Sequence, residues 1–159
     1  MGTDPIFLIA RMLTERKQTL AIAESSAGGL INAAMVGVPG ASAYYIGGCI
    51  VYTAASREGL LGITAADMQG VRSASEPFAR LMAQRVRIRL GATWGLAETG
   101  ASGPAGNRYG DAPGHACFAV DGPVSKSITL ETGKADREAN MREFTQAALQ
   151  LLKSCVEKT

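Results

Sequence analysis

Two glycine-rich turns, each directly after a short apolar run, constrain this chain most strongly. The first spans residues 23–29 (AESSAGG) and the second spans residues 98–106 (ETGASGPAG). An apolar run that ends in small hydroxyl and glycine residues is typical of a buried strand. Such a strand leads to a helix start or a loop whose backbone N–H groups bind anions. Two such ends in one chain of 159 residues predict a single anion-holding site.

Apolar spacing places the remaining elements around these turns. We expect strands at residues 20–23, 44–52, 94–97, 115–120 and 127–130. We expect helices at residues 5–17 and 30–36, after the Ser75 cap, and from about Asp136. A further short helix is expected from a capping box at residues 64–67, closed by Gly70. This order predicts one domain over residues 1–159, a three-layer α/β/α sandwich with a mixed, largely parallel sheet. Gly47 and Gly48 interrupt the second strand, so we expect a bulge or a close backbone approach there.

Composition excludes several classes of function. The formal charge is only +2, which provides no field to collect a polyanion, so no nucleic-acid partner is expected. Cys49, Cys117 and Cys155 are widely separated and include no Cys-x-x-Cys pair, which favours reduced thiols in a cytoplasmic protein. Residues 1–6 contain no basic leader, so we expect neither a signal peptide nor a membrane partner. The only histidine, His115, has no ligand cluster beside it, so no metal or cofactor is expected.

The motifs, taken in order, resemble those of the C-terminal domain of the CinA competence/damage-inducible family. The residues that carry the resemblance are 23–31, 39–42, 47–63, 75–77 and 99–104. Characterised members of this family are nicotinamide-nucleotide amidohydrolases. The resemblance therefore implies hydrolysis of the carboxamide of nicotinamide mononucleotide, or a similar small nucleotide-like substrate, by a serine assisted by a lysine.

The resemblance also implies roles for individual residues. Ser25 is the implied nucleophile, and Tyr52 and Thr99 match polar positions of the family site. Backbone N–H groups near Gly28, Gly29 and Gly100 are expected to hold the oxyanion or the substrate phosphate. Arg137 matches a C-terminal arginine suited to a phosphate or carboxylate, with Arg142 as its rival. The expected substrate-binding residues also include Gly48 and Gly103.

One departure from the family pattern affects the chemistry directly. The family lysine is Arg57 here, and a guanidinium stays protonated at neutral pH, so it cannot replace a lysine as general base. Ser26 and Ala27 stand where the family usually has Cys-Thr, and Glu98 precedes Thr99 where an apolar or small residue is usual. We expect Glu24 or Glu98 to contact Arg57 directly or through one water, because an unpaired buried charge costs several kcal/mol. Either glutamate, with its pKa raised by burial, is also a candidate base.

Each singled-out residue has a structural interpretation as well. Ser25 can cap the helix that follows, Tyr52 can lie at the sheet edge, and Thr99 can satisfy its own turn. Arg57 can lie in solvent, and the two glutamates can cap the turns beside them. Two functional alternatives also stay open, namely a catalytically silent nucleotide-binding domain and a regulatory or interaction module. The apolar segment 41–46 is suited to pairing with a second copy, as in a homo-oligomer. If the site is real, Ser25, Tyr52, Arg57 and Thr99 line one pocket.

Overall fold

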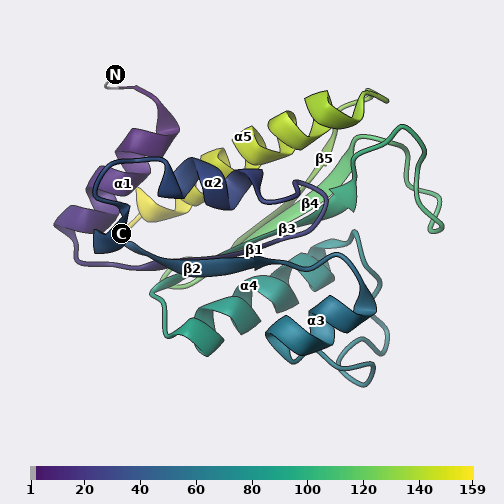
Figure 1. Cartoon of the computed structure of the whole chain (residues 1–159), viewed down its shortest axis with the longest axis horizontal. Helices are drawn as coiled ribbons and strands as arrows, with labels where there is room; N and C mark the ends of the chain where they lie inside the picture. Colours follow the sequence, from purple (N-terminus) through teal and green to yellow (C-terminus); the bar gives the residue numbers. More distant parts are fainter. Residues whose placement is uncertain (1–2) are drawn as a thin grey trace.

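The computed structural model describes residues 3–159, and four of its five strands point the same way (Figure 1). Met1 and Gly2, which begin the segment where no leader is expected, lie outside the described residues. The strands are β1 (Leu20–Glu24), β2 (Tyr45–Ile50), β3 (Trp94–Ala101), β4 (His115–Asp121) and β5 (Lys126–Glu131). Their order across the sheet is β2-β1-β3-β4-β5, and only β4 runs antiparallel to its neighbours. The predicted mixed, largely parallel sheet is confirmed.

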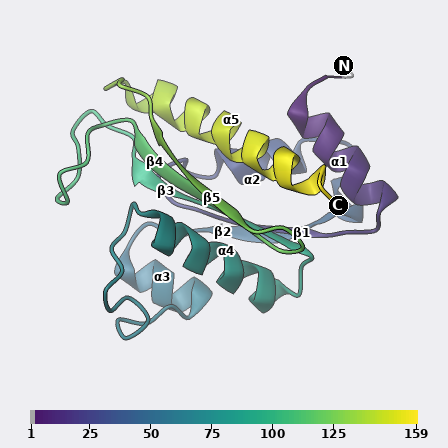
Figure 2. The same ribbon diagram turned by 180° about the vertical axis from the view of Figure 1, so that it is seen from behind.

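Helices cover both faces of this sheet, which confirms the three-layer sandwich (Figures 1 and 2). One face carries α1 (Pro5–Glu15), α2 (Leu30–Val36) and α5 (Arg137–Val156), and the other carries α3 (Ala54–Leu61) and α4 (Glu76–Leu90). The connection after β1 crosses one face and the connection after β2 crosses the other. The loops therefore part at the carboxyl ends of β1 and β3, where open α/β sheets form a crevice. None of the helices within residues 3–159 is long and apolar enough to cross a membrane.

The two faces of the sheet have side chains of different size. Toward α1, α2 and α5 the strands present large residues, including Ile22, Trp94 and Phe118. Toward α4 they present small ones, including Ala23 and Ala97. On this side a Cβ added at Gly95 would lie 2.1 Å from the carbonyl oxygen of Ala83, so the backbone of α4 lies directly on the strand.

Local signals decide where the helices begin. Ser75 caps α4 by accepting from the N–H of Phe78, and Asp136 caps α5 by accepting from Ala139, as predicted. The prediction of a helix at residues 64–70 is wrong. The Thr64–Asp67 capping bonds form, but the segment makes only turns before Gly70.

Two features lie next to β2, namely the helix that follows it and the irregular pairing at its start. The helix α3 was not predicted; it begins at a capping box between Thr53 and Ser56, in which serine stands where glutamate or glutamine is usual. The expected irregularity in β2 is present, because Leu20 pairs with Tyr45 whereas Ala21 pairs with Gly47.

Candidate active site

Ser25, Tyr52, Arg57 and Thr99 line one cavity of about 470 Å³, as predicted. Ser25 directly follows β1, Tyr52 follows β2, and Thr99 lies near the end of β3. Parallel strands bring these ends to the same edge of the sheet. The complete lining is Ser25, Val51, Tyr52, Thr53, Ala54, Arg57, Ser73, Ala74, Phe78, Thr99, Gly100, Asn107, Arg108 and Tyr109.

The buried carboxylate of Glu24 binds the backbone N–H groups at the start of α2. Its oxygens accept from the backbone N–H groups of Gly29 and Asn32 at 2.7 Å each, and from Ile31 at 3.2 Å. The Asn32 amide adds a fourth bond at 2.7 Å. The N-cap of α2 is Gly29, so Ser25 is not the helix cap that one interpretation allowed. The carboxylate of Glu24 does the capping instead.

Buried Glu98 holds the other side of the same turn. One of its oxygens accepts from the N–H groups of Ser25 at 3.0 Å and Ala27 at 2.9 Å, and the other accepts from the Ser26 hydroxyl. Burial raises the pKa of Glu98 to about 7, against the opposing effect of these three hydrogen bonds. Ser26, Ala27 and Glu98, the departures from the family pattern, thus interact with one another.

The expected direct contact of Arg57 with a glutamate is absent among residues 3–159. The carboxyl oxygens of Glu24 and Glu98 accept hydrogen bonds from backbone N–H groups and from the side chains of Asn32 and Ser26. Neither glutamate lines the cavity. Arg57 does line the cavity, and its Nε is buried without a hydrogen-bond partner among residues 3–159. A guanidinium left in this state is disfavoured until an acceptor binds it.

Thr99 ties the cavity wall to His115. The Oγ1 of Thr99 accepts from the N–H of Ala74 at 3.1 Å, so Thr99 does not satisfy its own turn. Ala74 has a φ of 54°, and its carbonyl oxygen lies 2.7 Å from His115 Nε2. His115 Nδ1 lies 2.5 Å from Glu131 Oε1, so both ring nitrogens face acceptors, which suits the doubly protonated ring. Burial is the largest single effect on the pKa of His115 and lowers it, but the contacts with Glu131, Ala74 and Asp111 together raise the pKa above its ordinary value.

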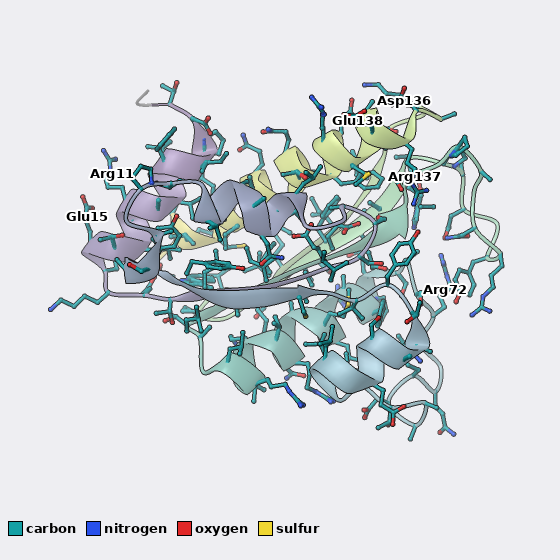
Figure 3. The ribbon with its side chains drawn as sticks, viewed as in Figure 1. Arg11, Glu15, Arg72, Asp136, Arg137 and Glu138 are labelled. Atoms are coloured by element: carbon teal, nitrogen blue, oxygen red, sulfur yellow. The ribbon has the colours of Figure 1, made fainter. Side chains whose placement is uncertain are left out.

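Arg137 reaches the same end of the molecule from α5. Its guanidinium donates to the carbonyl oxygen of Gly103 at 2.5 Å and to the Tyr52 hydroxyl at 3.0 Å. Tyr52 is 63% exposed and lies at the rim of the cavity. Arg142, the alternative to Arg137 in the sequence prediction, instead pairs with Glu138 on the exposed side of α5. Figure 3 shows Arg137 and Arg72 at one end of the sheet and Arg11 at the other.

Several of the expected glycines lie elsewhere. Gly28 and Gly29 do not line the cavity, and their N–H groups donate to the Ser25 carbonyl oxygen and to Glu24. Gly48 is a packing residue, because a Cβ there would lie 2.0 Å from Asn32 Oδ1. Gly103 contributes its carbonyl oxygen to Arg137, whereas Gly100 lines the cavity as expected. In the turn 25–29, the N–H of buried Ser26 is the one that has no acceptor among the described residues.

The far wall comes from the 102–114 loop and from Ser73 and Ala74. The guanidinium groups of Arg72 and Arg108 each lie 5.0 Å from the centroid of the Tyr109 ring. The hydrogen bond from Arg108 lowers the pKa of the Tyr109 hydroxyl. Arg72 is anchored by Asp111 at 2.7 Å, so this wall is fixed from outside the cavity.

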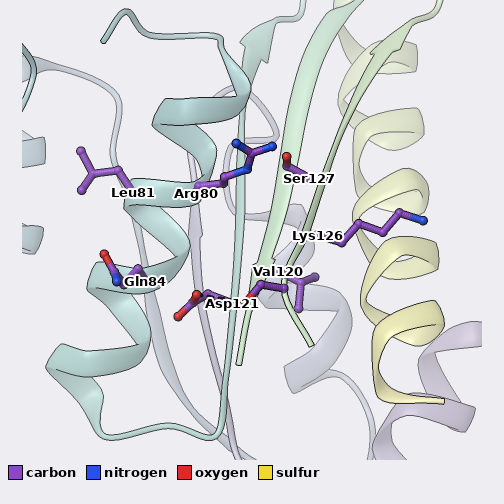
Figure 4. A pocket seen from close by; sticks show the side chains of 8 residues that line it. Arg80, Leu81, Gln84, Val120, Asp121, Lys126 and Ser127 are labelled. Carbon is purple, nitrogen blue, oxygen red and sulfur yellow. Dashed lines mark hydrogen bonds between the residues drawn. The ribbon is translucent and has the colours of Figure 1, made fainter. Parts of the chain in front are cut away.

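A second hollow of similar volume lies between α4 and the β4–β5 hairpin (Figure 4). Its lining includes Arg80, Asp121 and Lys126, but none of the predicted site residues. Volume therefore does not distinguish the two hollows, and the chemistry of their linings does. Among residues 3–159, no group of three or more His, Cys, Asp or Glu side chains is placed to hold a metal ion.

Comparison with known proteins agrees with this architecture. The family profile described as "CinA C-terminal domain" matches residues 6–156. A CinA-like protein of Gloeobacter violaceus is 38% identical over 146 residues, which cover 91% of this chain and 34% of that protein. A CinA-like protein of Synechococcus is 41% identical over 115 residues, which cover 72% of this chain and 27% of that protein. This chain thus spans about a third of the length of these relatives.

Solved structures show the same fold. A competence-damaged protein (CinA) superfamily structure from Klebsiella pneumoniae has a TM-score of 0.91 at 23% identity, covering 98% of both chains. The competence/damage inducible protein CihA from Agrobacterium tumefaciens has a TM-score of 0.86 at 24% identity, covering 98% of this chain and 97% of the other. The profile match over nearly the whole length, together with the relatives, shows that this chain belongs to the CinA C-terminal domain family.

Proposed function

We propose that this domain is an amidohydrolase of the nicotinamide-nucleotide type that acts slowly, with Ser25 as its nucleophile. The observation that carries the proposal is the cavity itself, where Ser25, Tyr52, Arg57 and Thr99 meet at the carboxyl ends of parallel strands. Membership of the CinA C-terminal domain family supports the same substrate class. Free Cys49, Cys117 and Cys155 suit a cytoplasmic enzyme that acts on a small nucleotide.

In the proposed reaction the Ser25 Oγ attacks the carbonyl carbon of the amide. The C–N bond breaks, the nitrogen leaves as ammonia with the proton of the serine hydroxyl, and an acyl-enzyme forms. Water then attacks this ester, which releases the carboxylic acid and restores Ser25. The Ser26 N–H is suited to bind the oxyanion, since it directly follows the nucleophile and has no internal acceptor within the described turn.

The proposed rate is low because no group in the cavity is a good proton acceptor. The guanidinium of Arg57 has N–H donors and no acceptor, and Glu98 binds the backbone of the turn rather than the Ser25 hydroxyl. General-base assistance is typically worth ~10² to 10⁴-fold. A silent nucleotide-binding domain is the second candidate, and the full occupation of both glutamates by local hydrogen bonds is the observation that favours it.

The test measures ammonia release from nicotinamide mononucleotide beside binding of the same nucleotide. Arg57→Lys should raise the rate toward ~10² to 10⁴-fold, because a lysine can lose its proton where an arginine cannot. Arg57→Lys combined with Ser25→Ala should abolish the gain. Arg11→Gln, on the exposed surface of α1, is the remote control. Binding without release in wild type and in Arg57→Lys would favour the silent domain. Rapid release that survives Ser25→Ala would refute the serine mechanism.

A further inference from the structure

The charged side chains that line the cavity are all of one sign, and the carboxyl groups of Glu24 and Glu98 lie behind the lining, where they bind the turn. The lining includes the guanidinium groups of Arg57 and Arg108, and no Asp or Glu is among the described residues that form it. Asp111, the nearest acidic residue on the adjoining loop, is engaged by Arg72 and Asn107. Among the lining side chains, a bound cation therefore finds no compensating charge, whereas a bound anion finds two.

The polar groups deep in the cavity are suited to donate. Arg57 has five N–H donors and no acceptor, and its buried Nε lacks a partner within residues 3–159. No ion pair fixes this guanidinium in the described part of the chain, so it can turn its Nε–Nη edge toward a ligand. Thr99 Oγ1 already accepts from Ala74, which leaves its own proton for donation. The Ser25 hydroxyl lines the same space.

Apolar and aromatic side chains stand beside these donors in the mostly polar lining. Val51, Ala74 and Phe78 are buried side chains of the lining, and the Tyr109 ring closes the loop side. Such walls suit a flat ring, and a planar carboxylate on that ring matches the fork of an arginine better than an amide does. An amide would place its own N–H₂ donors against donors of the protein.

We propose that this cavity binds an aromatic carboxylate, free or as part of a nucleotide, in preference to the corresponding carboxamide. This inference rests on the proposed function only for the position of the ligand's reactive group beside Ser25. In an enzyme that hydrolyses the amide, the preferred ligand is then the product acid, and Arg57 retains what the reaction releases.

The charge on a pyridinium ring sharpens the preference. An N-ribosylated pyridine carboxamide carries a positive ring with no charge to balance it near Arg57. The corresponding acid carries the same ring with a carboxylate that balances it. Because the lining offers only cations, the acid avoids a repulsion that the amide retains.

The experiment compares the binding of nicotinate mononucleotide and nicotinamide mononucleotide by titration calorimetry. We expect wild type to bind the acid at least about tenfold more tightly, since a charge-assisted bond replaces a donor–donor clash. Arg57→Gln should remove this ratio, and Arg57→Lys should keep part of it, because the charge remains without the fork. Arg11→Gln should keep the full ratio, and thermal unfolding checks that each variant is folded.

Two further ligands identify the group that Arg57 binds. Nicotinate should compete with the nucleotide in an Arg57-dependent way, whereas ribose 5-phosphate should compete independently of Arg57. Equal affinity for acid and amide, a ratio that persists in Arg57→Gln, no binding of any acid, or Arg57-dependent binding of ribose 5-phosphate would each overturn the proposal. Absence of ammonia release would refute the proposed hydrolysis and leave the carboxylate preference standing.

Discussion

Glu98 should make the stability of this domain fall as the pH rises through the weakly acidic range. Its ordinary pKa is 4.5 and its pKa in the folded protein is about 7, because burial outweighs three hydrogen bonds. Between these values the folded state holds a proton that the unfolded chain releases. A rise in pH therefore favours unfolding, so the contribution is complete below pH 4.5 and lost above pH 7.

The size of the effect follows from the gap between the two pKa values. One pH unit corresponds to 1.36 kcal/mol, so the full contribution is about 3 kcal/mol, most of which is lost between pH 5 and pH 8. Glu98→Gln has nearly the shape of the protonated acid. Its amide oxygen can accept from the N–H groups of Ser25 and Ala27, and its nitrogen can donate to the Ser26 hydroxyl. The variant should therefore lack this pH dependence.

The assay is urea unfolding at pH 5, 6, 7 and 8 for wild type and Glu98→Gln. Relative to the variant, wild type should lose about 2 to 3 kcal/mol across this range. The pKa of His115 is also raised above its ordinary value, but His115 is present in both proteins and its contribution cancels in the difference. Glu15→Gln, an exposed site on α1, should show no such change. A difference that is constant, or that grows with pH in favour of wild type, would mean that the hydrogen bonds outweigh burial.

Three further substitutions test packing and buried hydrogen bonds. Gly95→Ala should lower the free energy of unfolding by ~1 to 3 kcal/mol, because the new methyl group meets the Ala83 carbonyl oxygen. In contrast, Gly59→Ala inside α3 should raise it by ~0.5 to 1 kcal/mol, since space is open there; opposite signs in urea unfolding would contradict the packing argument. Asn140→Ala should cost ~2 to 4 kcal/mol, because fully buried Asn140 donates to Ser102 and Lys134 and accepts from Thr132. A change in melting temperature no larger than that of an exposed control, Ser42→Ala, would show that water replaces these bonds.

The sequence predicted what local patterns encode. The apolar runs and caps such as Ser75 place most strands and helices correctly, because burial and capping depend on near neighbours. The helix at residues 54–61 was missed because its apolar stripe is weak and a serine completes its capping box. The helix expected at 64–70 failed for the opposite reason, since its capping bonds form without a following helical segment.

For the cavity, the ends of strands and the family motifs predicted which residues come together, but not their hydrogen-bond partners. Ser25 and Thr99 meet because β1 and β3 are parallel neighbours, and the apolar run followed by a glycine-rich turn at each position indicated a shared site. The direct contact of Arg57 was predicted wrongly, because Glu98 lies 73 positions from Ser25 and its bond to that N–H depends on the register of the sheet. Ala74 was beyond prediction for the same reason, since it is held by Thr99 and His115.

The unequal faces of the sheet also affect where this fold can tolerate change. On the side of α5, large side chains meet large side chains, and a lost methyl group can be replaced by a neighbour that shifts. On the side of α4, the backbone of the helix rests on the backbone of β3 at Gly95, so no side chain is available to absorb a difference in volume. The cavity takes Phe78 and Ala74 from that rigid side. A new ligand preference is therefore easier to obtain through the loop that bears Arg108 and Tyr109 than through the floor beneath it.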